Sequence, residues 1–138
     1  MDELYGRDLV RLWWVDYAGV RRIRVVPARR MKENKNSRIG ITPAALGMPA
    51  VQDTAPPLSK LSPVGECWLN PDWDHLIRYQ LEESRRSVPF VPVTFHEVTE
   101  DISKATHISP WPYCPRSLLQ RVTDNIKTEF GIEIRAGF

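Results

Sequence analysis

The histidine and cysteine side chains are the first places to look for chemistry in this chain of 138 residues. The histidines, His75, His96 and His107, lie far apart, and none stands at a metal-ligand spacing from Cys67 or Cys114. Two such cysteines also do not form a disulfide framework. The chain contains neither a glycine-rich phosphate loop nor a serine nucleophile motif. The residues alone therefore define no complete active site.

Three aspartates are the next candidates. Asp53 falls in a proline-punctuated stretch, residues 34–64, and long loops in compact domains usually carry function or are disordered. We therefore single out Asp53 as the candidate catalytic residue, with an ordinary solvent-exposed aspartate as the alternative. Asp72 and Asp74 follow Pro71, where an aspartate bonds its own backbone, so a turn role is favoured for them.

Six basic residues are concentrated between positions 21 and 32: Arg21, Arg22, Arg24, Arg29, Arg30 and Lys32. Alternation along a strand and a short helix explains them as a solvated face, which we favour. Binding of an anion or a nucleic acid stays the alternative. The formal net charge of +2 is too small to argue for a nucleic-acid or anionic-membrane partner.

Composition limits the class of protein further. No apolar run approaches the roughly 20 residues of a membrane span, and the acidic start lacks the apolar core of a secretory signal. The sequence predicts a soluble, cytoplasmic protein of one domain in a reducing compartment.

The elements that must position these residues begin with a hairpin. Residues 9–16 (LVRLWWVD) place Val10, Leu12 and Trp14 on one face, and both faces look largely covered, which indicates a central strand or a strand against a partner. Gly19 allows the connection to a return strand at residues 21–26. Pro27 ends that strand, and a short basic helix over residues 28–35 is expected next.

The middle of the chain predicts short strands over residues 66–69, 75–81 and 88–98. Because Pro89 and Pro92 cannot donate ladder hydrogen bonds, the last of these is expected to be an edge strand or irregular at its start. Residues 100–111 are expected to form a loop.

The C-terminal stretch predicts an amphipathic helix that starts near Pro115 and stops at Gly131, where a positive φ is needed. Its apolar stripe contains Leu118 or Leu119, Val122, Ile126 and Phe130. Residues 132–138 are expected to form a half-buried strand, because Ile132, Ile134 and Ala136 alternate with Glu133, Arg135 and Gly137. Together these elements predict an α+β fold with one main helix packed on a mixed sheet.

Three segments, in order, resemble the small N-terminal domain of glutamine synthetase and its relatives. They are residues 15–19 (VDYAG) with Arg22 and the Val26-Pro27 pair, residues 65–72 (GECWLNPD), and residues 114–122 (CPRSLLQRV). The resemblance implies a β-grasp-like domain over residues 1–109. Residues 110–138 would be a linker, helix and first strand leading into a catalytic domain that is missing here.

The same resemblance implies an ATP-dependent glutamate–ammonia or glutamate–amine ligase. In that family the carboxylates that bind divalent metal beside ATP come after the position of Phe138, so this fragment is expected to be inactive alone and to hold no cofactor. ATP and Mg²⁺ or Mn²⁺ would serve the full-length enzyme. Homo-oligomeric rings are implied as well, with Trp13 and Trp14 available for contacts, and burial in the core of a monomer would explain these two residues equally well.

Asp53 gains a role from the resemblance. Many family members use an aspartate in an Asp-Gly-Ser-Ser loop of the small domain to reach a neighbouring subunit's active site and help bind ammonium. That motif does not occur here, but Asp53-Thr54 lies in the corresponding region. The departure leaves the identity of the amine open. The alternative function is a stand-alone interaction module, derived from the small domain, without ligase activity.

Overall fold

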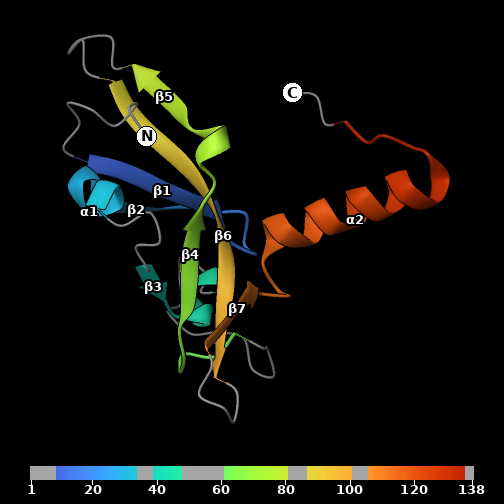
Figure 1. Ribbon diagram of the computed structural model, residues 1–138, viewed down its shortest axis with the longest axis horizontal. Coiled ribbons are helices and arrows are strands. Elements are labelled where there is room, and N and C mark those ends of the chain that lie inside the picture. The colour runs from blue at the N-terminus through green and yellow to red at the C-terminus, as the bar shows by residue number, and fades with distance from the viewer. Residues whose placement is uncertain (1–8, 34–38, 48–60, 81–86, 101–105, 136–138) are drawn as a thin grey trace.

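Figure 1 shows the arrangement of the strands and helices, and the buried apolar side chains form one core. The computed structural model describes residues 9–33, 39–47, 61–80, 87–100 and 106–135. The seven strands are β1 (Leu9–Val15), β2 (Arg21–Pro27), β3 (Ile39–Ile41), β4 (Cys67–Pro71), β5 (Ile77–Gln80), β6 (Ser87–Glu100) and β7 (Thr106–Pro110). The helices are α1 (Ala28–Glu33) and α2 (Pro115–Phe130), with 3₁₀ turns η2 (Pro43–Leu46) and η3 (Trp73–His75). The α+β class predicted for a β-grasp-like domain, with a mixed sheet and one main helix, is confirmed.

The hairpin forms as predicted, and β1 is a central strand. It pairs antiparallel with β2 from Leu9↔Pro27 to Val15↔Arg21, and parallel with β6 over residues 11–13. Val10, Leu12 and Trp14 are buried, because alternate residues of a strand point to the same face. The predicted basic helix is confirmed as α1, and residues 34–35 of that prediction lie outside the described residues.

Strand β6 is the centre of the sheet, so the prediction of an edge strand is wrong. Its first half pairs with β1 and β5 and its second half with β4 and β7. One edge of β6 therefore carries β1 and then β7, and the other carries β5 and then β4. Pro92 is tolerated because its carbonyl points to the second edge, where Asp72 N–H bonds it at 2.9 Å. The N–H and the carbonyl of one strand residue point to the same edge, so the N–H that proline lacks would also have pointed away from β1. The pairing of β6 with β1 therefore loses no hydrogen bond at Pro92.

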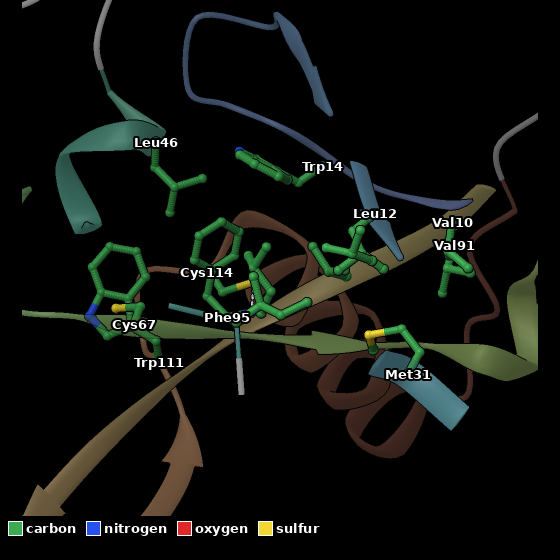
Figure 2. Close-up of a cluster of buried hydrophobic side chains, with 14 of the residues drawn as sticks. Val10, Leu12, Trp14, Met31, Leu46, Cys67, Val91, Phe95, Trp111 and Cys114 are labelled. Atoms are coloured by element: carbon green, nitrogen blue, oxygen red, sulfur yellow. Dashed lines mark hydrogen bonds between the residues drawn. The ribbon is translucent and has the colours of Figure 1, made fainter. Parts of the chain in front are cut away.

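The core lies on the inner side of the curled sheet (Figure 2). Leu12 of β1 lies beside Val91, and Val93 and Phe95 continue the same face of β6. Phe95 meets Trp14 edge-on at 5.7 Å between ring centroids and Trp111 at 6.3 Å. Met31 of α1 and Leu46 of η2 are fully buried in the same cluster.

Helix α2 has the predicted limits, with Pro115 in its first turn and Gly131 at φ 67° after its last. It extends away from the sheet (Figure 1), contacts it through its first turn, and buries none of its own residues, so the prediction that this helix packs on the sheet holds for its first turn alone. Among the described residues, no helix has the length and apolar character needed to cross a membrane.

Two local expectations are wrong. Residues 131–135 form no strand and are exposed, because an alternating pattern becomes a strand only where another strand pairs with it. Residues 136–138 of the predicted strand lie outside the described residues. Conversely, part of the expected loop at residues 100–111 is β7, which pairs with the end of β6 from His96↔Pro110 to Glu100↔Thr106.

Candidate functional site

Asp53, the candidate catalytic residue of the sequence, lies outside the described residues. Within the described ranges, no group of three or more His, Cys, Asp or Glu side chains is placed to hold a metal ion. The described residues therefore do not fit a divalent-metal site, and no chemical step through a metal is derived from them. What they do assemble is a pair of aspartate-centred clusters and two grooves beside the first turn of α2.

The first cluster closes the hairpin at Asp16, which is buried although it is charged. Its Oδ1 accepts hydrogen bonds from Ala18 N–H at 2.9 Å and Val20 N–H at 2.8 Å, and its Oδ2 accepts one from Arg22 Nε at 2.8 Å. Burial opposes ionisation of Asp16. The Arg22 bond and the two backbone bonds outweigh burial and lower the pKa of Asp16. This carboxylate therefore sets the shape of the turn.

The second cluster, at Asp72, joins two distant parts of the chain. Asp72 Oδ2 accepts a hydrogen bond from Arg116 Nη2 at 2.9 Å and lies 2.8 Å from His75 Nδ1. Partial burial opposes ionisation of Asp72, but the His75 and Arg116 contacts prevail and lower its pKa. Arg116 stands in the first turn of α2, so the ion pair fixes where that helix leaves the sheet.

A polar groove of about 550 Å³ surrounds the Asp72 cluster. Thr94 and Pro110 of the sheet form its floor, and polar residues of α2, including Gln120, Arg121 and Asp124, form its wall. Gln120 Nε2 donates to Asp124 Oδ1 at 2.9 Å. Both signs of charge line this groove, so it selects neither an anion nor a cation by charge alone.

An apolar cleft of about 270 Å³ lies on the other side of the same first turn. β1 pairs with residues 90–92 of β6, and β7 pairs with residues 96–100 along the same edge. The cleft lies in the gap between these two paired stretches. Trp14, Val93 and Phe95 line it from the sheet, and Pro115 and Leu119 line it from α2. Trp14 is 8% exposed, and its Nε1 finds no hydrogen-bond partner within the described parts of the chain.

Tyr17 ties the hairpin turn to the start of α2. Its backbone N–H bonds Leu46 O at 2.8 Å, and its hydroxyl donates to the carbonyl of Tyr113. Burial raises the pKa of Tyr17, so the phenol remains a donor at neutral pH. The turn, η2 and the beginning of α2 are therefore joined through one residue, by its backbone N–H and its hydroxyl.

The cysteines have structural positions. Both are buried and free. Burial, followed by the charge of Glu97, raises the pKa of Cys67 to about 11, so its thiol stays protonated. Cys114 precedes α2 without capping it; its Sγ instead accepts the backbone N–H of Phe95 at 3.3 Å, in the gap between β1 and β7. Neither thiol is set up as a nucleophile.

The histidines are not brought together. His75 contacts Asp72, His96 lies 3.4 Å from Thr94 Oγ1 through its Nε2, and His107 is exposed on β7. Burial lowers the pKa of His96 and favours its neutral form. The three histidines therefore do not form a shared site.

The basic cluster is divided among several roles. Arg22 pairs with Asp16, Arg24 Nη1 donates to Gly40 O at 2.8 Å, and Arg21 lies over the ring of Trp13 at 5.5 Å. Arg29 and Arg30 are exposed on α1. The five arginines of this cluster, whose side chains the structure describes, thus do not face one surface together.

The sequence did not predict two ion pairs, one between Asp16 and Arg22 and one between Asp72 and Arg116. A signal was present, because all four lie in the segments that resemble glutamine synthetase. The spacing of those segments did not reveal that the second and third are joined by an ion pair. Asp74, weighed beside Asp72, is exposed in η3.

Of three comparisons with known proteins, the one with solved structures gives matches. A scan against protein-family models finds no match, and neither does a search of curated proteins. Among solved structures, the chain is similar to a structure described as a novel glutamine synthase homolog, with a TM-score of 0.69 and 25% identity over 93% of this chain. Two structures of GmaS, one without ligand and one in complex with ADP, give TM-scores of 0.62 and 0.61 at 22% and 21% identity, each over 93% of this chain.

The matched region is a fraction of each of those proteins. This chain covers 28% of the glutamine synthase homolog and 25% of each GmaS chain. Its structural neighbours are thus glutamine synthetase homologues, as the sequence resemblance predicted, and the coverage is consistent with an N-terminal domain of such proteins.

Proposed function

We propose that this chain is the N-terminal domain of an ATP-dependent glutamate–ammonia or glutamate–amine ligase of the cytoplasm. In this proposal it shapes one side of an active site between subunits, contributes to oligomer contacts, and is inactive alone. The observation that carries the proposal is the likeness to the glutamine synthase homolog over 93% of this chain and 28% of that one.

The apolar stripe of α2 supports the proposal independently. Leu119 is 64% exposed and Phe130 is 68% exposed, and Val122 between them is exposed as well. A helix that carries an apolar stripe and buries none of it within its own domain presents a surface for another one. We assign this stripe to contact with the catalytic domain, which follows the matched region in the resemblance described above.

The clusters at Asp16 and Asp72 have a supporting role in the proposal. They hold the hairpin turn and the first turn of α2 in place, and so orient α2 for the catalytic domain. ATP, the divalent metal and glutamate would be bound by residues beyond those described. Asp53 stays our candidate for contact with the amine in a neighbouring subunit.

The first test is the intact mass and activity of the protein as its source cells make it. An antibody raised against this chain should detect a polypeptide several times heavier. The purified polypeptide should release ADP from ATP only when glutamate and an amine are both present. A native species of this chain's own mass, or a heavy species without such activity, would count against the ligase.

Variants of the heavy polypeptide then locate the contribution of this domain. Val122→Glu places a charge on the stripe and should reduce ligase activity at least tenfold by separating the domains. Thr128→Glu places the same charge on the polar face of α2 and should leave activity unchanged. Equal effects of the two variants would remove the stripe from the proposal.

Asp53 is tested by its effect on the amine. Asp53→Asn should raise KM for the amine at least tenfold while KM for ATP stays the same, because the lost carboxylate would act on the amine alone. Asp74→Asn, at an exposed turn position, is the matched control and should change neither constant. An unchanged KM for the amine in Asp53→Asn would reject this residue.

The stand-alone interaction module remains the second candidate. It is favoured by the presence of two separate grooves, polar and apolar, on either side of the first turn of α2. A native polypeptide of 15.9 kDa, the mass of this chain, is the result that would select it.

A further inference from the structure

The outer face of the sheet, turned away from the core, is continuous over four strands. Ladder partners lie on the same face, so the pairs Trp13↔Ile23, Arg11↔Val25, Arg11↔Phe90 and Ile77↔Phe90 connect β2, β1, β6 and β5 across this side. We call this surface, formed by alternate residues of β2, β1, the first half of β6, and β5, the outer face. It meets the stripe of α2 that the proposed function uses at the apolar cleft, which Trp13 and Leu119 both line.

The outer face is rich in apolar side chains that contact solvent. Ile23 and Val25 of β2 are 46% and 48% exposed, and Ile77 and Tyr79 of β5 are 57% and 60% exposed. Trp13 and Phe90, in the middle, are only half-buried. An apolar patch of this extent on a folded domain is typical of an interaction surface.

The charges on the outer face have one sign. Arg11 lies 5.6 Å from the centre of the Phe90 ring, and Arg21 lies 5.5 Å from that of Trp13. No Asp or Glu occupies an outer-face position of these four strands, and within the described residues neither arginine is in an ion pair. A guanidinium that stacks on a ring keeps its N–H groups free at its edge, where they match a carboxylate.

We propose that the outer face binds a protein segment that is apolar and carries at least two carboxylates, one for Arg11 and one for Arg21. Charge complementarity and the exposed apolar side chains together select this partner. A nucleic acid fits less well, because its affinity depends on many cations at phosphates, and this face offers two cations among a larger number of apolar side chains. A second copy bound by the same face would set arginines against arginines.

The proposal is independent of the ligase. It requires only the outer face of the sheet, and it holds whether the chain is part of a longer enzyme or is a module on its own. A failure of ligase activity would leave it standing, and a failure of acidic segments to bind would leave the proposed function standing.

Random 16-residue peptides displayed on phage and selected on the intact chain test the proposal directly. The selected sequences should combine aliphatic or aromatic residues with at least two Asp or Glu. The most frequent peptide, synthesised and titrated, should bind at least tenfold more weakly to the double variant Arg11→Gln with Arg21→Gln. Arg121→Gln removes an arginine from α2 instead and should leave its affinity unchanged.

Ile23→Lys separates the outer face from the stripe of α2, which could also capture apolar peptides. It should abolish binding, whereas Val122→Lys should not. Circular dichroism and thermal unfolding of each variant establish that the fold is intact.

Several results would overturn the proposal. The selected peptides could lack acidic residues, their affinity could be unchanged in the arginine double variant, or Val122→Lys rather than Ile23→Lys could abolish binding. Tighter binding of a single-stranded 12-nucleotide DNA would identify a nucleic acid instead. A dimer in sedimentation that Ile23→Lys dissociates would identify a second copy of the chain.

Discussion

Strand β6 and helix α2 both carry regular apolar patterns, and the structure treats them in opposite ways. Val91, Val93 and Phe95 of β6 are at most 2% exposed, whereas Leu119 and Phe130 of α2 are exposed by about two-thirds. β6 has four strands along its two edges, and α2 contacts the sheet through its first turn. A regular repeat of apolar residues therefore predicts that one face of an element is buried, but it does not identify the surface that buries this face.

The same comparison separates two kinds of stabilisation. The core around β6 contributes to folding, because its side chains leave water when the domain folds. The stripe of α2 contributes little until another surface covers it. Substitutions in the two regions should therefore differ most in their effect on the free energy of unfolding of this chain.

Phe95→Ala should have the largest effect. It removes the ring that contacts both Trp14 and Trp111 and leaves a cavity, which costs about 3–5 kcal/mol of unfolding free energy in comparable cores. Urea unfolding followed by tryptophan fluorescence measures this loss. A change below about 1 kcal/mol would mean that the core around β6 is not the main source of stability.

Asp16→Asn should come next, with a loss of about 1–3 kcal/mol, because the buried carboxylate bonds Arg22 and two backbone N–H groups. The effect depends on pH. Asp16 has a lowered pKa when folded, so its contribution is complete above the unfolded pKa, about 3.9, and disappears as pH falls through the folded value. The stabilities of the two proteins should therefore converge as the pH falls from about 5 through the folded pKa. A gap that stays constant with pH would contradict this assignment.

Arg116→Gln should have a smaller effect, about 0–1 kcal/mol, because its ion pair with Asp72 is open to solvent. Its consequence should be seen in α2 rather than in global stability. Amide hydrogen exchange in the first turn of the helix should accelerate, while exchange in β6 stays the same. Equal acceleration in both regions would show that the ion pair supports the whole sheet.

Phe130→Ser should have the smallest effect, within about 0.5 kcal/mol, since the side chain is already exposed. Thermal unfolding of the isolated chain checks this. The comparison with Phe95→Ala is the sharpest test, because the same residue type is removed from each of the two regions. A destabilisation of more than about 1 kcal/mol would mean that the end of α2 is packed in solution.

Local pattern predicted much of the fold. The hairpin followed from the alternation of Val10, Leu12 and Trp14 and from Gly19 at φ 77°. The limits of α2 followed from Pro115 and Gly131. These features depend on a few neighbouring residues, so the sequence of a short stretch determines them.

Long-range pairing was beyond the same reasoning. The prolines of β6 suggested an edge, because the chain does not reveal that Pro92 directs its carbonyl to Asp72. β7 was missed because its pattern is short, and a strand was expected after Gly131 because the pattern there does not show whether a partner exists. Of the candidate site, the sequence identified the segments that carry Asp16, Asp72 and Arg116 but not the contacts that join them.

The parallel pairing of β1 with β6 has a consequence for the order of folding. Arg11 and Phe90 are ladder partners across roughly eighty residues of chain, and closing so long a loop costs entropy before any contact repays it. The hairpin can therefore form early, during synthesis, with Leu12 and Trp14 still uncovered. Only when β6 has emerged can the inner face close, so a nascent chain halted before residue 87 should expose these residues to chaperones.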